Sequence, residues 1–518
     1  MTTILPCVHS YYSLQRGVAH PLAVCEAARS LGYSALALTD TNGLYGLYPF
    51  LEACRETGLS PILGVELRTG TVSPVVAACA PGTPAPGAVR AAHALRGTAS
   101  LTRAVLLARD RGGYATICRA ISAYHRAARP LEKSLMGTAT VTESFDLIAH
   151  LKADHAGVVV LSDHPPLVRA LHEPLGPDRL FVELRTGHRT FAALRLAEDL
   201  GLSPVASCDA YMLHPSDHPL HRLLRAIDLD TSLSRVPASE LCLPEAWLMP
   251  PDALARAFRH SPEAITNAAR LAETLHRDWR FDTLVFPTYP VPPEFPSAAV
   301  YLRRLAEEGV TRRYGSISDR ARERLDRELG LIERKGFADY FLVVWDIVTR
   351  FPRTCGRGSA AASLVAYALG ITHVDPIRHN LFFERFLNEG RKDPPDIDVD
   401  FPWDERDQVI EYVFRRYGPE RTAMISNHNT FQPRAAIREV AKVHGMPEHE
   451  IKDVTERFPW HWDEVDLGDM VKTHPMFQGA DLRPPWPEIL ATAQRILGFP
   501  RLLSTHCGGV VIAPGPIT

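Results

Sequence analysis

The sequence predicts an α/β fold divided among several domains. From the N-terminus to about residue 230, short apolar runs such as Ser34–Thr39 (SALALT) and Pro61–Leu67 (PILGVEL) alternate with segments of helical periodicity. Strand, helix and strand at this spacing are typical of βα units around a parallel sheet or barrel. At 518 residues the chain is too long for one core, so we expect two to four domains.

Further runs extend the pattern in the first half. Ala104–Ala108, Gly157–Ser162 and Pro204–Ser207 are predicted strands, and Pro21–Leu31 is a predicted helix. The stretch from Gly70 to Ser100 is rich in Ala, Pro and Gly, which is typical of a surface insertion.

Proline marks a boundary in the middle of the chain. Five prolines between residues 287 and 296 exclude a helix or a central strand there, so we expect a linker after the helical segment Pro244–Leu275. An arginine-rich helix, Ala299–Lys335, and a largely helical region, Gln408–Lys472, are predicted beyond it. The final apolar run, Gly508–Ala513, is predicted to be a buried strand.

Charge and cysteine usage exclude several classes of protein. The net charge of −3 gives no overall basic field, so any contact with nucleic acid must come from local clusters of Arg and Lys. No run approaches the roughly 20 apolar residues that span a bilayer, and no secretory signal is visible. The 9 cysteines stand singly, which argues against a zinc ribbon or a disulfide framework. We expect a soluble, cytoplasmic protein with no membrane partner.

The segment Pro395–Phe401 (PDIDVDF) alternates acidic and apolar residues. On a strand, Asp396, Asp398 and Asp400 would share one face, and the apolar residues between them would face a core. Carboxylates this close repel one another unless cations neutralise them, and Mg²⁺ prefers such oxygen ligands. Two ions held there would clamp a phosphoryl displacement. The alternatives are a solvated edge strand and, less consistent with the apolar spacing, a calcium loop.

A glycine-rich segment, Cys355–Gly370 (CGRGSAAASLVAYALG), precedes this strand. Gly358 allows close backbone approach, and Ser359 is a good N-cap for the Ala-rich helix behind it. Free N–H groups at that helix start would bind an anion, and Arg357 could add a bidentate phosphate contact. The segment lacks the spacing and the lysine of a P-loop, so tight helix packing stays an alternative.

Two groups of basic residues are further candidates. Arg385, within Phe382–Asn388 (FFERFLN), is either a phosphate ligand or a surface ion-pair partner. The glycine segment, this arginine and the aspartates lie in one short stretch and together indicate a nucleotidyl-transfer site. The helical region carries a set of basic residues that either contact DNA phosphates or form a solvated helix face. They are Arg415, Arg416, Arg434, Arg438 and Lys442.

These motifs resemble bacterial C-family DNA polymerases, the family of the DNA polymerase III alpha subunit and its error-prone relatives. Gly356–Pro376, Phe382–Asn388 and Pro394–Phe401 are similar to the palm of that family. Four segments resemble the N-terminal PHP domain of that family: His9–Ser13 (HSYYS), Ala37–Gly46 (ALTDTNGLYG), Gly64–Glu66 (GVE) and Ala206–Leu213 (ASCDAYML). Phe431–Gly445 is similar to the thumb, and Ser504–Pro514 to the segment that returns to the palm.

The resemblance implies a PHP-type distorted βα barrel, followed by an incomplete α+β palm with an inserted, mostly helical thumb. The implied boundaries are PHP domain 1–235, helical segment and Pro-rich linker 236–298, first part of the palm 299–425, thumb 426–500 and returning palm strands 501–518.

The resemblance also implies a reaction, the template-directed addition of a deoxynucleotide to a primer 3′ end during replication or repair. Asp396 and Asp398 match the first two catalytic aspartates, with Asp400 beside them as a further metal ligand. Gly358, Ser359 and Arg385 match positions that handle the incoming triphosphate. The implied cofactor is Mg²⁺, with Mn²⁺ as a substitute, and the implied partners are primer–template DNA and deoxynucleoside triphosphates.

The PHP motifs depart from the family pattern. His9, Asp40, Glu66 and Asp209 match metal ligands, and His164 is a further candidate. However, Tyr11, Thr41 and Tyr211 stand where histidine is usual, and Arg16 stands where an acid or histidine is common. Phenol and hydroxyl groups are poor neutral ligands, and a guanidinium repels a metal ion. We therefore expect the PHP metals and a metal-dependent proofreading activity to be absent, which favours an error-prone member.

The family's third catalytic aspartate and its fingers lie beyond the thumb, and no match to them is found here. We expect an N-terminal fragment or split half that is inactive alone and is completed by a chain carrying the other domains. A non-catalytic remnant or interaction protein is the alternative. A stand-alone PHP phosphoesterase would need the PHP ligands intact.

Overall fold

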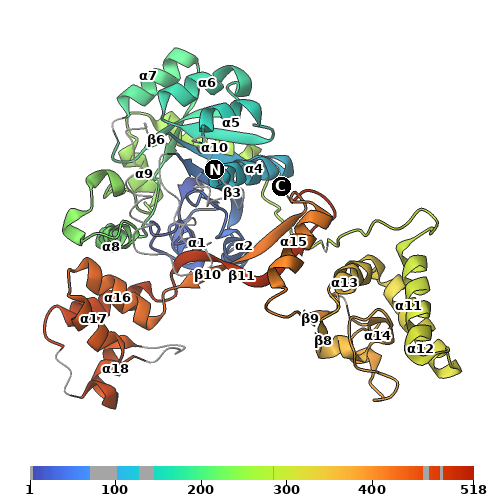
Figure 1. Ribbon diagram of the computed structural model, residues 1–518. Coiled ribbons are helices and arrows are strands. Elements are labelled where there is room, and N and C mark those ends of the chain that lie inside the picture. The colour runs from blue at the N-terminus through green and yellow to red at the C-terminus, as the bar shows by residue number, and fades with distance from the viewer. Residues whose placement is uncertain are drawn as a thin grey trace, which may run out of the picture. The chain divides into compact units, whose positions relative to one another are not determined.

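The computed structural model forms two compact units (Figure 1). Unit 1 comprises Met1–Arg280 and Asn427–Thr505, and unit 2 comprises Phe281–Ser426 and His506–Thr518. The residues described are 4–69, 102–127, 145–188, 190–283, 285–391, 393–458, 466–478 and 482–517, so the predicted insertion from Gly70 to Ser100 lies outside them. None of the described helices is long and apolar enough to cross a membrane.

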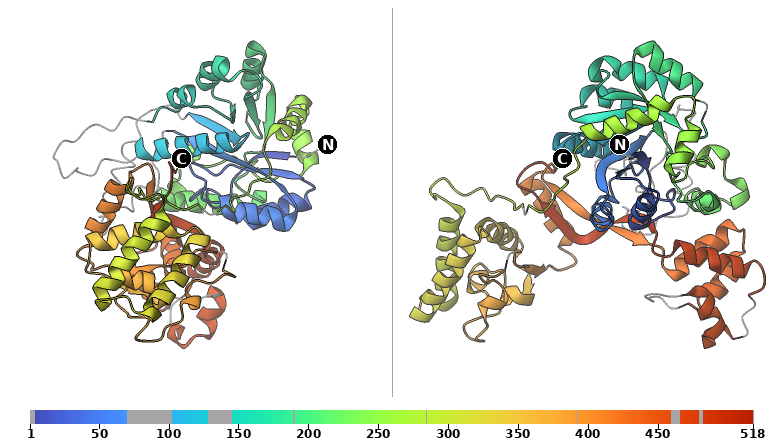
Figure 2. Two further views of the ribbon diagram at one scale, coloured as in Figure 1. Left: turned by 90° about the vertical axis from the view of Figure 1, so that its right-hand side faces the viewer. Right: turned by 180° about the vertical axis from the view of Figure 1, so that it is seen from behind.

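Seven strands of unit 1 form one curled sheet in chain order, which Figure 2 shows from two further sides. The pairs β3–β4 and β4–β5 are antiparallel and the other neighbours are parallel. A parallel bridge from Val8 to Ala210 brings the chain after the last strand beside the first, which confirms the distorted barrel. The strands are β1 (Ile4–Val8), β2 (Ala35–Leu38), β3 (Ser60–Arg68), β4 (Arg103–Ala108), β5 (Val158–Ser162), β6 (Leu180–Arg185) and β7 (Pro204–Ser207).

The strands are buried on both faces, because apolar residues occupy both sides of the sheet. Ala35, Ala37 and Ile62 belong to a core that helix α10 covers, whereas Leu36 and Leu38 belong to the core beneath the other helices. This arrangement explains why β2 is a continuous apolar run. The helices of this region are α1 (Pro21–Ser30), α2 (Leu47–Thr57), α4 (Arg111–Ala127), α5 (Leu147–Ala153), α6 (Pro165–Leu175), α7 (Phe191–Leu200), α8 (His218–Asp228), α9 (Pro251–Ala257) and α10 (Pro262–Thr274).

Unit 1 also contains most of the predicted thumb. Helix α16 lies beside α8 (Figure 1), and Leu220, Leu224, Ile437 and Val440 share one apolar cluster. The contacts group these helices with the barrel. The predicted start of a separate thumb domain at residue 426 stays a prediction. The helices are α16 (Pro433–Val443), α17 (Glu448–Thr455), α18 (Leu467–Thr473) and α19 (Trp486–Ile496).

In unit 2, the prediction of one continuous helix over Ala299–Lys335 is wrong, because two helices occupy that stretch. Gly315 adopts φ +79° after the first helix, and the Ser318 hydroxyl caps the second by accepting a bond from the Ala321 N–H at 3.3 Å. The elements here are α11 (Ala298–Tyr314), α12 (Asp319–Arg334), α13 (Ala338–Arg350), β8 (Cys355–Arg357), α14 (Leu364–Ala368), β9 (Asp398–Asp400) and α15 (Arg406–Tyr417).

The remaining sheet has two strands, β10 (Thr422–Thr430) and β11 (Pro500–Ile512). The first of them interrupts the region Gln408–Lys472, which was predicted to be largely helical. The prediction that Gly508–Ala513 is buried is also wrong, because Val511 is 45% exposed. A two-stranded ribbon can bury only one face, and here Val510 and Ile512 pack against Tyr417.

A buried carboxylate connects two helices of unit 2. Glu328 of α12 is fully buried and pairs with Arg324 (Nε to Oε1, 2.9 Å). Its other oxygen accepts bonds from the Ser363 hydroxyl at 2.9 Å and the Val365 N–H at 3.1 Å, where α14 begins. This carboxylate therefore fixes the start of α14 against α12.

Replacement of Glu328 by Ala should lower the free energy of unfolding by about 3 kcal/mol, because Arg324 and two buried donors lose their acceptor. Glu328→Gln should lose less, since its amide oxygen still accepts from Ser363 and Val365. Pulse proteolysis in urea measures both. The control is Glu333→Ala, an exposed residue of the same helix, and equal losses for Glu333→Ala and Glu328→Ala would contradict the assignment.

Candidate functional site

The predicted carboxylate strand lies in unit 2 and pairs with the glycine-rich segment. Strands β8 and β9 are antiparallel, with Arg357 opposite Asp398. The strand covers Asp398–Asp400 alone, which is shorter than predicted, but the predicted alternation holds across the segment. The three aspartates are exposed, while the apolar residues Ile397, Val399 and Phe401 pack against the core of unit 2.

Glycine is required at two positions of this segment for different reasons. Gly358 has φ +69°, and a Cβ there would lie 3.0 Å from Oδ2 of Asp398, so backbone approaches the carboxylate closely. At Gly356 a Cβ would lie 2.2 Å from the carbonyl oxygen of Ile371. Close packing therefore explains Gly356, and close approach to an acidic group explains Gly358.

The predicted N-cap at Ser359 is wrong. Residues Gly358–Ala362 form a short 3₁₀ turn, and Ser363 caps α14 by accepting a bond from the Ala366 N–H at 3.1 Å. The Val365 N–H is already bonded to Glu328. The start of α14 is thus bonded internally, and the exposed Ser359 lies in the turn before it.

Arginines lie close to two of the aspartates. Arg357 donates from Nε to Oδ1 of Asp400 at 3.1 Å, and Arg391 lies 3.7 Å from Asp396. Arg385 ends a short 3₁₀ turn and is exposed, while Phe383 in the same turn is buried. The surface therefore combines exposed carboxylates with guanidinium groups.

This donor set fits Mg²⁺, which commonly binds one or two carboxylates together with substrate phosphates. Asp396 and Asp398 are exposed and would be the ligands, and Asp400 already accepts from Arg357. Within the described part of the chain, these aspartates do not form a group of three ligand atoms within 4.8 Å of one another. An ion held by these carboxylates would therefore need other ligands.

The basic candidates do not form one cluster. Arg415 and Arg416 lie on α15 of unit 2 and pair with acids, Arg415 with Glu411 and Arg416 with Asp346 at 3.3 Å. The other three lie on α16 of unit 1: Arg434 donates to the carbonyl oxygen of Phe458 at 2.5 Å, and Arg438 and Lys442 are exposed. Because they are four residues apart, Arg438 and Lys442 share a helix face.

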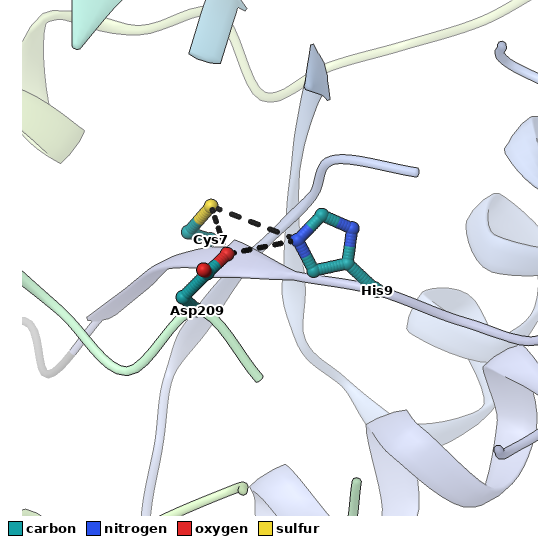
Figure 3. A group of neighbouring side chains, drawn as sticks. All are labelled: Cys7, His9 and Asp209. Carbon is teal, nitrogen blue, oxygen red and sulfur yellow. Dashed lines mark hydrogen bonds and ion pairs between the residues drawn. The ribbon is translucent and has the colours of Figure 1, made fainter. Parts of the chain in front are cut away.

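The predicted PHP residues His9, Asp40, Glu66 and Asp209 meet at one end of the barrel in unit 1, and all are buried. Figure 3 shows His9 with Asp209 and Cys7. His9 Nε2 lies 3.2 Å from Oδ1 of Asp209 and 3.4 Å from Oε2 of Glu66. The Asp40 carboxylate instead accepts bonds of 2.7 to 2.8 Å from Ser10 and Ser13.

The centre of this cluster is an arginine that the sequence analysis missed. Arg103 Nε donates to Oε1 of Glu66 at 2.7 Å, Nη2 donates to Oδ1 of Asp209 at 2.9 Å, and Nη1 donates to Glu183. Burial alone would raise the pKa of Asp209, but Arg103, His9 and Arg185 hold this pKa well below its ordinary value. Protein cations thus keep Asp209 ionised despite its burial.

Cys7, His9 and Asp209 bring ligand atoms within 4.8 Å of one another, a geometry that a metal could use. However, Nη2 of Arg103 lies 3.6 Å from Sγ of Cys7 and 2.9 Å from Asp209. Burial also raises the pKa of the Cys7 thiol, and a protonated thiol is a poor ligand. The group does not fit a metal ion while Arg103 is in this position.

Two of the atypical PHP residues, Thr41 and Tyr211, take part in the same network. The ring of Tyr211 stacks on His9 at 3.9 Å, and its hydroxyl donates to Oε2 of Glu66 at 2.5 Å. The Thr41 hydroxyl donates to the same oxygen at 3.3 Å. The His164 side chain accepts a bond from the Leu167 N–H at 3.4 Å and so caps α6. Hydrogen-bond donors therefore stand at two positions where the family usually has histidine.

Two family models match the chain. Residues 300–518 match the bacterial DNA polymerase III alpha NTPase domain, and residues 7–187 match the PHP domain. An error-prone DNA polymerase of Symbiobacterium thermophilum is 32% identical over 98% of this chain and 47% of its own length. The chain belongs to the bacterial DNA polymerase III alpha family.

Both DNA polymerase III alpha subunits and error-prone DNA polymerases are similar to this chain. The DNA polymerase III subunit alpha of Bacillus subtilis is 32% identical over 99% of this chain and 45% of its own length. An error-prone DNA polymerase of Pseudomonas savastanoi pv. phaseolicola is 34% identical over 98% of this chain and 47% of its own length. The chain thus spans about half the length of the family members that it matches.

Replacement of Arg103 by Ala should lower the free energy of unfolding by about 4 kcal/mol at pH 7, because it leaves buried carboxylates unpaired. Hydrogen exchange of peptides from β3, β4 and β6 measures this change. The control is Arg109→Ala, at an exposed residue just after β4. It should change the free energy of unfolding by no more than about 0.5 kcal/mol.

The loss in the free energy of unfolding that Arg103→Ala causes should depend on pH. Because the folded-state pKa of Asp209 lies below its ordinary value, the ion pair stabilises the fold above about pH 4 and the stabilisation is lost at lower pH. The difference between the native protein and Arg103→Ala should therefore shrink below pH 4. A deficit that stays constant across this range would contradict the ion-pair account.

Proposed function

We propose that the exposed aspartates of unit 2 supply metal-binding carboxylates of a DNA-directed DNA polymerase. The observation that supports this is the position of Gly358 against Asp398, with Arg357 on the neighbouring Asp400. Exposed like charges beside a glycine backbone favour binding of cations and phosphates over a structural role. The reaction is attack of a primer 3′ oxygen on the α-phosphorus of a deoxynucleoside triphosphate, and pyrophosphate leaves.

The residues of this surface have separate parts in that reaction. Asp396 and Asp398 would hold Mg²⁺ or Mn²⁺, which lowers the pKa of the attacking hydroxyl and neutralises the phosphates when bound. Gly358 and Ser359 let the triphosphate approach the backbone, and Arg385 offers an exposed guanidinium to it. Arg357 orients Asp400 through their hydrogen bond.

We further propose that polymerisation requires domains other than those in these 518 residues, carried by the rest of the polypeptide or by a partner chain. The chain corresponds to 45% to 47% of the length of its relatives, and its exposed carboxylates lack a third close ligand among the described residues. The PHP domain is proposed to act as a scaffold without metals, because Arg103 pairs with the carboxylates that would bind them.

Primer extension tests the role of the aspartates. The 518 residues alone should give no extension, and they should support it when joined to the remainder of a relative such as the Bacillus subtilis subunit. In that longer protein, Asp398→Asn should slow extension more than about a hundredfold, since partners of metal ligands alone contribute about 10- to 100-fold.

Asp407→Asn is the matched control, because it removes the same charge from an exposed site on α15. It should extend at the rate of the unmodified protein. Extension by Asp398→Asn at that rate, or robust extension by the 518 residues alone, would contradict the proposal.

DNA binding should be independent of sequence and should weaken with salt. If Arg438 and Lys442 contact phosphates, replacing both by Gln should lower the slope of log affinity against log salt by about 1.8, or 0.9 for each duplex phosphate. Fluorescence anisotropy over a series of KCl concentrations measures the slope. Lys452→Gln on α17 is the control, and an unchanged slope in the double variant would exclude these contacts.

A further inference from the structure

Unit 1 contains a cavity of about 230 Å³ beside the PHP cluster, and Arg185 and Asp209 are among the residues that line it. Three guanidinium groups line it, from Arg16, Arg68 and Arg185, whereas Asp209 is the one carboxylate among its lining residues. Asp209 already accepts from Arg103 at 2.9 Å and from Arg185 at 3.3 Å. Arg68 pairs with Glu66 (Nε to Oε1, 2.5 Å) and Arg185 pairs with Asp209, so Arg16 has the most distant carboxylate of the three lining arginines.

Arg16 has little counter-charge for a buried arginine. Its side chain is 11% exposed, and Nη2 lies 3.7 Å from Oε2 of Glu240. That oxygen accepts a much shorter bond, 2.7 Å, from Arg225. Burial, together with Arg225 and Arg68, lowers the pKa of Arg16 to about 10, so it stays protonated at neutral pH. An anion in the cavity would supply the missing counter-charge.

Arg185 has an unused donor. Nη2 donates to Asp163 at 2.5 Å and Nη1 donates to Asp209, but Nε is buried without a hydrogen-bond partner among the described residues. Buried donors of this kind are rare in folded proteins, and a bound water or ion is one reason for them. An acceptor atom of an anion would complete the hydrogen bonding of this guanidinium.

His221 holds the walls of the cavity in place. Its Nε2 accepts a bond from the Cys242 N–H at 3.0 Å, so its Nδ1 carries the proton and donates to the Arg16 carbonyl oxygen at 2.7 Å. Both ring nitrogens are used, and burial lowers the pKa of His221 to about 3, which keeps it neutral. The backbone of Arg16 is therefore fixed before any ligand binds.

We propose that this cavity binds a phosphate-type oxyanion through Arg16, Arg68 and Arg185. Guanidinium groups present paired donors that match phosphate oxygens. Pockets for drug-sized ligands measure about 300 to 1,000 Å³, so this smaller cavity suits one or two phosphate groups. The ion is either free phosphate or pyrophosphate, or the terminal phosphate of a nucleic acid strand. Binding requires no metal and breaks no bond, and it is independent of the polymerase proposal.

Isothermal titration of the 518-residue protein in EDTA tests the proposal. The probes are inorganic phosphate, pyrophosphate, and a 5′-phosphorylated oligonucleotide with its unphosphorylated twin. Saturable binding of phosphate or pyrophosphate supports the site with a free ion as its ligand. Tighter binding of the phosphorylated oligonucleotide than of its twin supports the site with a terminal phosphate as its ligand. No saturable binding of any phosphorylated probe overturns the proposal.

Two variants locate the binding. Arg16→Gln should weaken it about tenfold through loss of a charge-assisted contact. Ser239→Asp places a negative charge on an exposed lining residue without removing any arginine, so it should weaken binding even if Arg16→Gln does not fold. Arg169→Gln, on the exposed surface of α6, should leave affinity within about twofold. Unchanged affinity in both Arg16→Gln and Ser239→Asp would overturn the proposal.

Discussion

The pairing of Arg103 with three buried carboxylates is the interaction on which the closed end of the barrel depends. Glu66, Glu183 and Asp209 come from β3, β6 and the turn after β7, and each would be costly to bury as an isolated charge. One planar guanidinium meets all three because its donors point in several directions. A cation that is part of the chain cannot be exchanged or chelated, which distinguishes this cluster from a metal site.

The two acidic groups of the protein have opposite environments. In unit 1 the carboxylates are buried and saturated by arginine, serine and tyrosine donors. In unit 2 Asp396 and Asp398 are exposed, and the backbone of Gly358 lies close to the Asp398 carboxylate. Saturated polar groups stabilise a structure, whereas unsaturated ones are available to a ligand. This contrast supports the proposal that the chemistry takes place in unit 2, although the PHP motifs contain more of the residue types that bind metals.

Local patterns predicted the features that depend on neighbouring residues. Five strands of the barrel and the exposed face of the aspartates followed from apolar runs and from alternation. Strand β1 was missed because Pro6 interrupts it, and β6 because the buried Glu183 lies within it. The cap of α14 was misassigned because Glu328, which bonds Ser363, lies 35 residues earlier. Arg103 was overlooked for the same reason, since Asp209 lies 106 positions away.

The pairing of β10 with β11 has a consequence for the order of folding. The helices α16 to α19 lie between these strands, so the ribbon closes a loop from Thr430 to Pro500. Closing such a loop in an unstructured chain costs entropy that a few ladder hydrogen bonds do not recover. Packing of α16 against α8 shortens the effective loop, since the helices then hold the end of β10 and the start of β11 in place. The ribbon should therefore form late, after the helices have docked on the barrel.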